Sequence, residues 1–231
     1  MKNAVAAFKF LTLGGRFEGA KNSPEQIGKG AVFFPLVGVL LGLILALVNG
    51  ALEPYLESEI LGVALMSIWI VMTGAMHLED VQKTFDELPI AYASRKPVRV
   101  YGFLALLVIV LFKIRAAEVA GEARTLSLLL TPVFARWSLV IFLYGSTAAD
   151  ESARAIAENV RAWHLLVATT ATLIFAAFVV GRTGLWIGLY LSLFALLART
   201  YLHRHGGIHN DNLGAFIELS EAFGLILFAS L

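Results

Sequence analysis

The first stretch of the sequence with residues suited to chemistry is residues 74–88, where acidic side chains follow an apolar run. In a continuous helix Glu79, Lys83 and Asp86 stand at positions i, i+4 and i+7 on one face, and Asp80 lies on a neighbouring face. Carboxylates at the end of an apolar segment are costly to bury unless they hold a cation or face water. The stretch is therefore a candidate cation site, with a solvated helix end as the alternative.

The second stretch begins with a glycine pair, Gly206 and Gly207, which lets the backbone turn tightly and approach a ligand closely. Asp211 and Glu218 follow on one face of the next helix. Because Glu218 lies in an apolar final segment, we do not expect it to face lipid. It should point into the protein, towards a cation, a polar cavity or a basic partner such as Arg136.

The composition of the chain defines its broad class. Of 231 residues, 58% are hydrophobic and 15% are charged, whereas soluble domains have roughly 45–50% and about 25%. The sequence therefore predicts a polytopic membrane protein, folded as one domain over residues 1–231, with the lipid bilayer as a partner. The net charge of +1 gives no indication of nucleic-acid binding. The absence of Cys excludes disulfides, thiolate metal sites and cysteine nucleophiles.

Apolar runs long enough to cross a bilayer predict about seven spans in an all-α bundle. Residues 1–13 are expected to form a short amphipathic or re-entrant helix, and residues 14–30 a loop. Within the first span, Gly38 and Gly42 form a small-xxx-small pattern that favours close helix packing. The expected spans are Ala31–Val48, Ile60–Met76, Val100–Ala120, Leu126–Tyr144, Leu165–Val180, Leu185–Leu202 and Leu213–Leu231.

The loops between these spans predict the orientation. Residues 79–99 and 199–211 are rich in Lys and Arg, whereas residues 49–59 contain only acidic charges. By the positive-inside rule the two basic loops are cytoplasmic and the acidic loop is external. Both clusters of chemical interest, with their catalytic loops, then lie at the cytoplasmic face.

Together the two clusters resemble the cobalamin-5′-phosphate synthase family. Shorter supporting matches are Phe8-Lys9-Phe10-Leu11-Thr12, Phe34-Pro35-Leu36-Val37-Gly38 and Arg136-Trp137. The main matches are His77-Leu78-Glu79 through Asp86, and Gly206-Gly207 through Asp211, Leu213-Gly214-Ala215, Glu218 and Glu221.

The resemblance implies a multi-pass transferase of the cell inner membrane. It would move the phosphocobinamide group of adenosylcobinamide-GDP onto α-ribazole or its 5′-phosphate, releasing GMP, with Mg²⁺ as cofactor. Its partners would be these corrinoid and ribazole-type substrates, and a homo-oligomer is compatible with the sequence.

The resemblance also suggests residue roles. The expected metal ligands are Glu79, Asp80, Asp86, Asp211 and Glu218. The expected catalytic residues are His77, Asp86, His209 and Asp211. The expected cofactor- and phosphate-binding residues are Arg95, Lys96, Arg99, Gly206 and Gly207.

One departure from the family pattern bears on function. Lys83 stands where the family has an acid, and Asp80 could supply the lost carboxylate from the neighbouring face. Three hypotheses follow. The chain is an active transferase with a rearranged site, a paralogue acting on another phosphate-linked substrate, or a non-catalytic transport or assembly protein in which Lys83 forms a structural ion pair.

Overall fold

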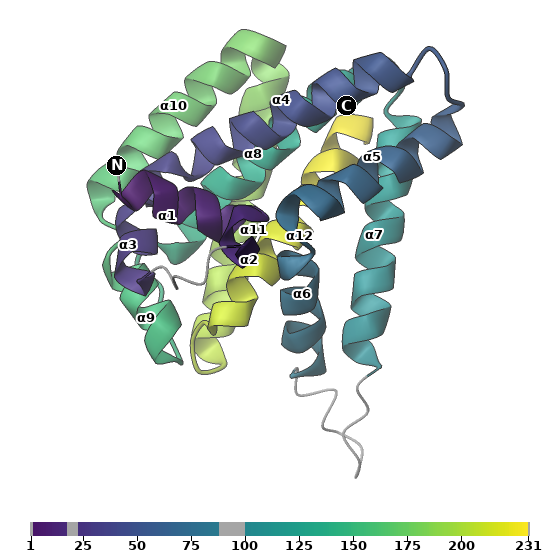
Figure 1. Ribbon diagram of the computed structural model, residues 1–231. Coiled ribbons are helices and arrows are strands. Elements are labelled where there is room, and N and C mark those ends of the chain that lie inside the picture. Colours follow the sequence, from purple (N-terminus) through teal and green to yellow (C-terminus); the bar gives the residue numbers. More distant parts are fainter. Residues whose placement is uncertain (1, 18–22, 88–99, 231) are drawn as a thin grey trace.

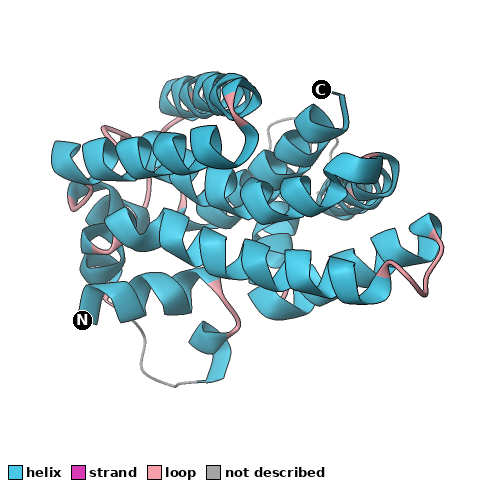
Figure 2. Cartoon of the chain, turned by 90° about the horizontal axis from the view of Figure 1, so that it is seen from above, coloured by secondary structure: helices cyan, strands magenta, loops and turns pink. Residues whose placement is uncertain are grey.

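The computed structural model describes residues 2–17, 23–87 and 100–230 (Figure 1). These residues form helices joined by turns, as Figure 2 shows, and an isolated backbone bridge joins Ala148 to Ile208. The predicted all-α class is confirmed. The helices are α1 (Lys2–Leu11), α2 (Gly14–Phe17), α3 (Pro24–Lys29), α4 (Phe34–Leu52), α5 (Ser58–Thr73), α6 (Met76–Asp86), α7 (Tyr101–Val119), α8 (Arg124–Leu143), α9 (Glu151–Glu158), α10 (Ala162–Val180), α11 (Arg182–Arg204) and α12 (Asn210–Ser230), with single 3-10 turns at η1 (Ala31–Phe33) and η3 (Gly121–Ala123).

Helix α8 is the centre of the bundle, packed by α4, α10, α11 and α12. The span that contains it is 83% buried. Its contact with α4 depends on the predicted glycine pair. A Cβ at Gly38 would lie 2.5 Å from the carbonyl oxygen of Pro132, and one at Gly42 would overlap the backbone of Leu129. The backbones of α4 and α8 can therefore approach this closely only because Gly38 and Gly42 have no side chains.

Among the described residues, five helical segments are long and apolar enough to cross a membrane, and α5 with α6 makes a sixth if the bent pair counts as one span. The sequence predicted about seven, so the count is approximate. The remaining predicted span is α7, which is a helix of 19 residues. Its last third carries Lys113, Arg115 and Glu118, and these charges lower its apolar character.

The chain turns by 88° between α5 and α6. Gly74 and Ala75, at the turn, both adopt left-handed backbone conformations with φ of 63° and 55°. For a residue with a side chain this conformation costs roughly 1–2 kcal/mol, so the surrounding packing must stabilise Ala75. Because of the bend, the polar helix α6 lies beyond the apolar span and runs alongside α12 and α7 (Figure 1).

The N-terminal segments partly match the prediction. Helix α1 buries Leu11 and exposes Phe8, as expected of a short amphipathic helix. The loop predicted for residues 14–30 is wrong in part, because α2 and α3 form there. Helix α3 starts with Pro24, a residue that favours the first helical turn.

Candidate functional site

The contact between α6 and α12 brings two of the predicted acidic residues together. Asp80 of α6 packs against Gly214 of α12, and Asp211, in the first turn of α12, is close enough for its charge to act on the Asp80 carboxyl. The approach depends on Gly214, because a Cβ at that position would overlap the carboxylate oxygen Oδ2 of Asp80. Because Gly214 of the Leu213-Gly214-Ala215 motif has no side chain, the Asp80 carboxylate can occupy the space beside it.

The electrostatics of this pair favour a cation. Burial, and after it the nearby Asp211 carboxylate, raise the pKa of the Asp80 carboxyl from 3.8 to about 7. Two adjacent carboxylates cannot both ionise without cost unless positive charge is close. The pair is thus prepared to bind a cation or to hold a proton.

Lys83 supplies one positive charge at the same place. Its Nζ lies 3.0 Å from Oε1 of Glu79 and 3.8 Å from Oδ1 of Asp211. The hydrogen bond that Lys83 donates to Glu79 raises the pKa of Lys83, so the ammonium remains protonated. The side chains of Lys83 and Glu79 are 47% and 54% exposed, so the cluster faces the surface.

Asp86 lies at the contact between α6 and α7. Its Oδ1 accepts a hydrogen bond of 2.9 Å from the backbone N–H of Gly102, in the first turn of α7. A Cβ at Gly102 would overlap the backbone of Gln82, so this glycine lets α6 and α7 pack closely. Asp86 joins the two helices.

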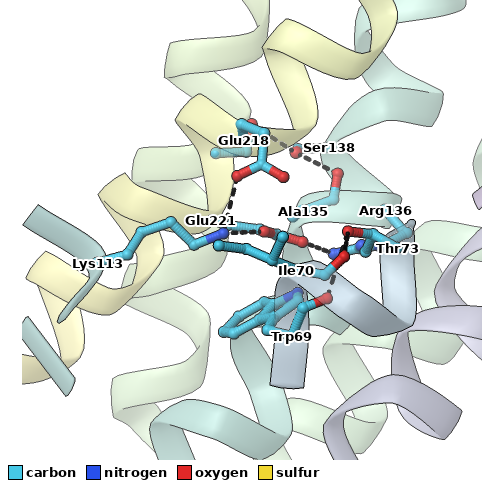
Figure 3. A network of polar contacts seen from close by, with 10 residues as sticks. Trp69, Ile70, Thr73, Lys113, Ala135, Arg136, Ser138, Glu218 and Glu221 are labelled. Carbon is cyan, nitrogen blue, oxygen red and sulfur yellow. Dashed lines mark hydrogen bonds and ion pairs between the residues drawn. The ribbon is translucent and has the colours of Figure 1, made fainter. Parts of the chain in front are cut away.

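Glu218, the other predicted metal ligand, lies deep in the bundle in a network of charges (Figure 3). Lys113 Nζ donates to Oε2 of Glu218 at 2.9 Å and to Oε2 of Glu221 at 2.5 Å. Arg136 pairs with the other oxygen of Glu221. Lys113 also lies 4.4 Å from the ring of Trp69. The ion pair with Arg136, one of the alternatives for the acids of the last span, is present at Glu221, whereas Glu218 pairs with Lys113, a partner that the sequence did not indicate.

The two predicted histidines lie in different environments. His77 is 2% exposed, and its Nε2 has no hydrogen-bond partner among the described residues. His209 is half exposed, and its Nδ1 lies 3.6 Å from Oδ2 of Asp150. Only His209 is accessible to a substrate at the surface.

Asp150 is a site residue that the sequence analysis missed. Its Oδ1 accepts from Ala153 N–H at 2.7 Å and begins α9, while its Oδ2 accepts from Asn210 N–H at 2.7 Å. One carboxylate thus fixes the starts of α9 and α12, and with them Asp211. The local signal was present, because an Asp before Glu151-Ser152-Ala153 is a typical N-cap.

The glycine pair is explained by backbone geometry. Gly206 and Gly207 have φ of 107° and 106°, values that favour glycine. The turn they form lets Ile208 pair with the 147–149 segment, with Ile208 N–H donating to Thr147 O at 2.9 Å. A Cβ at Gly207 would lie 2.9 Å from that same Thr147 oxygen. The close approach predicted for a ligand is occupied here by the protein's own backbone.

The predicted site is therefore assembled only in part. Asp80 and Asp211 are together, with Glu79 joined to them through Lys83, while Asp86 and Glu218 have other partners. In the described parts of the chain no group of three or more His, Asp or Glu side chains is placed to hold a metal ion. The phosphate-binding residues Arg95, Lys96 and Arg99 lie outside the described residues.

Fold and site together define a multi-pass helical membrane protein with a carboxylate pair at one end of its bundle. The chain matches the cobalamin-5-phosphate synthase family over residues 3–229. It belongs to that family, which confirms the resemblance seen in the sequence motifs.

Individual relatives cover nearly the same length. A protein of Pseudomonas paraeruginosa named adenosylcobinamide-GDP ribazoletransferase is 31% identical, with the alignment covering 99% of this chain and 98% of the relative. A protein of the same name from Geotalea daltonii is 30% identical over 87% of this chain and 86% of the relative. No solved structure matches the chain significantly.

Proposed function

We propose that this chain is the transferase that joins adenosylcobinamide-GDP to α-ribazole or its 5′-phosphate. The observation that carries the proposal is the packing of Asp80 against Gly214, beside Asp211, in a chain that matches the family over residues 3–229. The relatives named as ribazoletransferases support the choice of substrates. Because function depends on the site rather than on the fold alone, the residues must also account for the reaction.

The reaction exchanges one bond to phosphorus for another. A hydroxyl oxygen of the ribazole attacks the phosphorus on the cobinamide side of the pyrophosphate, and the bond from that phosphorus to the bridging oxygen breaks. GMP leaves with the bridging oxygen and its electron pair. Catalysis then requires charge neutralisation of the phosphates and placement of the acceptor hydroxyl.

The residues of the site divide these tasks. Lys83 binds a phosphate oxygen as a protonated ammonium, and Asp211 keeps that ammonium in place. His209 is accessible and close in sequence to Asp211, so it accepts the proton of the acceptor hydroxyl. Asp150, next to His209, fixes this end of α12.

Mg²⁺ fits the carboxylates that are present. It is commonly held by one or two carboxylates together with substrate phosphates, and Asp80 and Asp211 are such a pair. When bound, it would neutralise charge on the phosphate oxygens. The lack of a third ligand among the described residues agrees with a site that the substrate completes.

The active face is proposed to be cytoplasmic, in the cell inner membrane. Helices α6, which contains Lys83, and α11, which ends at Arg204, both end at the same end of the bundle, and the α4–α5 connection at the other end contains Glu53 and Glu57 (Figure 1). This distribution of charge follows the positive-inside rule.

The test uses the full chain in lipid nanodiscs with adenosylcobinamide-GDP and α-ribazole. GMP release and formation of the joined corrinoid are measured with Mg²⁺ and with EDTA. Equal amounts of both products, formed only with Mg²⁺, support the proposal. A folded protein that forms neither product would contradict it and favour a paralogue or a non-catalytic relative.

A further inference from the structure

A cavity of about 280 Å³ lies where α6 and α11 end and α12 begins. Its wall is rich in aromatic rings: Phe85 of α6, Phe142 of α8, Tyr201 of α11 and Phe216 of α12. The rings of Phe142 and Phe216 are stacked, with centroids 4.4 Å apart and planes 11° apart. Small and aliphatic residues, among them Ala198, complete the wall. The cavity therefore suits a flat apolar ring.

The polar end of this cavity is formed by residues that are next in the chain to two members of the acidic cluster. Thr84 and Asn212 line it, and Asn212 Nδ2 donates to Thr84 Oγ1 at 3.2 Å. Thr84 follows Lys83 in the chain, and Asn212 follows Asp211. The Nζ of Lys83 lies 3.8 Å from Oδ1 of Asp211. A molecule with an apolar ring in the cavity would therefore present its other end to Lys83 and Asp211.

We infer that this cavity binds the benzimidazole base of the ribazole acceptor, with the ribose directed to Thr84 and Asn212. The inference rests on the proposed function and names the part of the site that recognises the acceptor. The volume of about 280 Å³ is just below the usual range for small-molecule sites, roughly 300–1,000 Å³. It accommodates a bicyclic base and is far too small for a corrin macrocycle.

The lining of the cavity also distinguishes the benzimidazole of the acceptor from the guanine of the donor. Apart from the hydroxyl groups of Thr84 and Tyr201 and the amide of Asn212, the lining side chains are apolar. A guanine base would bury several donors and acceptors with few partners, which is unfavourable. A benzimidazole has an apolar edge and loses little on burial. The cavity therefore favours the acceptor over the guanosine of the donor.

Other cavities in the described parts of the chain are less well placed. One of about 960 Å³ is formed by α8, α10 and α11, and one of about 360 Å³ by α1, η1 and α4. Neither is lined by a residue of α6 or α12. A ring bound in either would not adjoin the carboxylate pair.

The experiment fills the cavity and measures each substrate separately. Ala198→Phe adds a ring to the wall, and Ala162→Phe adds the same ring to the larger cavity between α8, α10 and α11. We expect Ala198→Phe to raise the KM for α-ribazole at least tenfold, while the KM for adenosylcobinamide-GDP stays within twofold of wild type. Ala162→Phe should change neither. The inference would be overturned if both variants changed the KM for α-ribazole equally. It would also be overturned if Ala198→Phe left that KM unchanged, as expected if a lipid chain occupies the cavity.

Equilibrium binding of α-ribazole without the donor separates this inference from the proposed reaction. Binding that is weakened at least tenfold by Ala198→Phe supports the cavity even if no GMP is released. Binding that is equal in wild type and Ala198→Phe, or absent from folded wild type, overturns the cavity even if GMP is released. Ala198→Leu, a smaller addition, keeps the test valid if the Phe variant does not fold, and it should weaken binding by a smaller factor.

Discussion

At the scale of single residues, Lys83 separates this chain from the acidic pattern that the family resemblance implies. The ammonium contacts Glu79 and Asp211, but both Lys83 and Glu79 are about half exposed. Exposed ion pairs contribute about 0–1 kcal/mol to stability. A purely structural role for Lys83 would therefore bring little, and a phosphate-binding role explains its place beside Asp211 better.

Replacing Lys83 should change the dependence on metal more than it changes the fold. In Lys83→Asp an added carboxylate joins Asp80 and Asp211, so the Mg²⁺ concentration for half-maximal GMP release should fall several-fold. The matched control is Lys29→Asp, because Lys29 also pairs at i,i+4 with a half-exposed acid, Glu25. Thermal unfolding with and without Mg²⁺ checks the fold. An unchanged Mg²⁺ dependence with a large loss of stability would identify Lys83 as a structural partner.

Asp80 should make stability depend on pH when metal is absent. Its folded-state pKa of about 7 lies above the unfolded value of 3.8. The unfolded carboxyl ionises first, so the folded protein loses stability as pH rises from 3.8 to about 7. Asp80→Asn should therefore be more stable than wild type at pH 8 in EDTA, with a free energy of unfolding higher by up to about 4 kcal/mol. At pH 4 the two should be nearly equal. A variant that is less stable than wild type at pH 8 would contradict this interpretation.

At the scale of elements, the α6–α12 contact depends on a single missing side chain. Gly214→Ala would push Asp80 away from Asp211, so we expect at least a tenfold loss of GMP release. The matched control is Gly50→Ala in α4, where a Cβ has open space. That substitution should stabilise its helix by about 0.5–1 kcal/mol and leave activity unchanged. Equal activity in both variants would show that the close approach is not required.

The buried network fixes α7 against α12. Lys113→Met leaves Glu218 and Glu221 short of positive charge in the bundle, and breaking a buried pair costs about 3–5 kcal/mol. Adding Glu218→Gln removes one unpaired charge and should recover part of that loss. Arg115→Met, on the exposed side of the same helix, should cost less than about 1 kcal/mol. Unfolding in nanodiscs measures all three, and a double variant no more stable than Lys113→Met would contradict the pairing.

The sequence alone was sufficient for features that are local or that bury charge. Helical spacing predicted that Asp211 and Glu218 share one face of a helix. The cost of burying acids in an apolar span predicted that they would have a basic partner inside the bundle. Lys113 was visible as a charge in a span. The partners of Lys113 could not be predicted, because a contact with Glu218, 105 positions away in the sequence, depends on how the helices pack.

Other parts of the site could not be predicted because backbone geometry decides them. Helical spacing placed Asp86 on the face of Glu79, but the 88° bend at Gly74 and Ala75 turned α6 so that Asp86 meets the start of α7. The composition of residues 74–88 contains no proline to mark such a bend.

At the scale of the whole molecule, the two ends of the bundle differ in charge, and this predicts the orientation. The chain has no Cys, so single cysteines give clean labels. Glu57→Cys and Arg204→Cys place them in exposed positions at opposite ends of the bundle. A membrane-impermeant thiol reagent should label position 57 from outside intact cells and position 204 only after permeabilisation. The reverse pattern would place the carboxylate pair outside the cell.

The carboxylate pair is the proposed centre of a ribazoletransferase. The most direct test compares Asp80→Asn and Asp211→Asn with Glu57→Gln, an exposed acid in the α4–α5 connection. Mg²⁺-dependent GMP release from adenosylcobinamide-GDP and α-ribazole is measured for each folded variant in nanodiscs. We expect a loss of at least a hundredfold in the first two and wild-type activity in the third. Wild-type release from both aspartate variants would contradict the account.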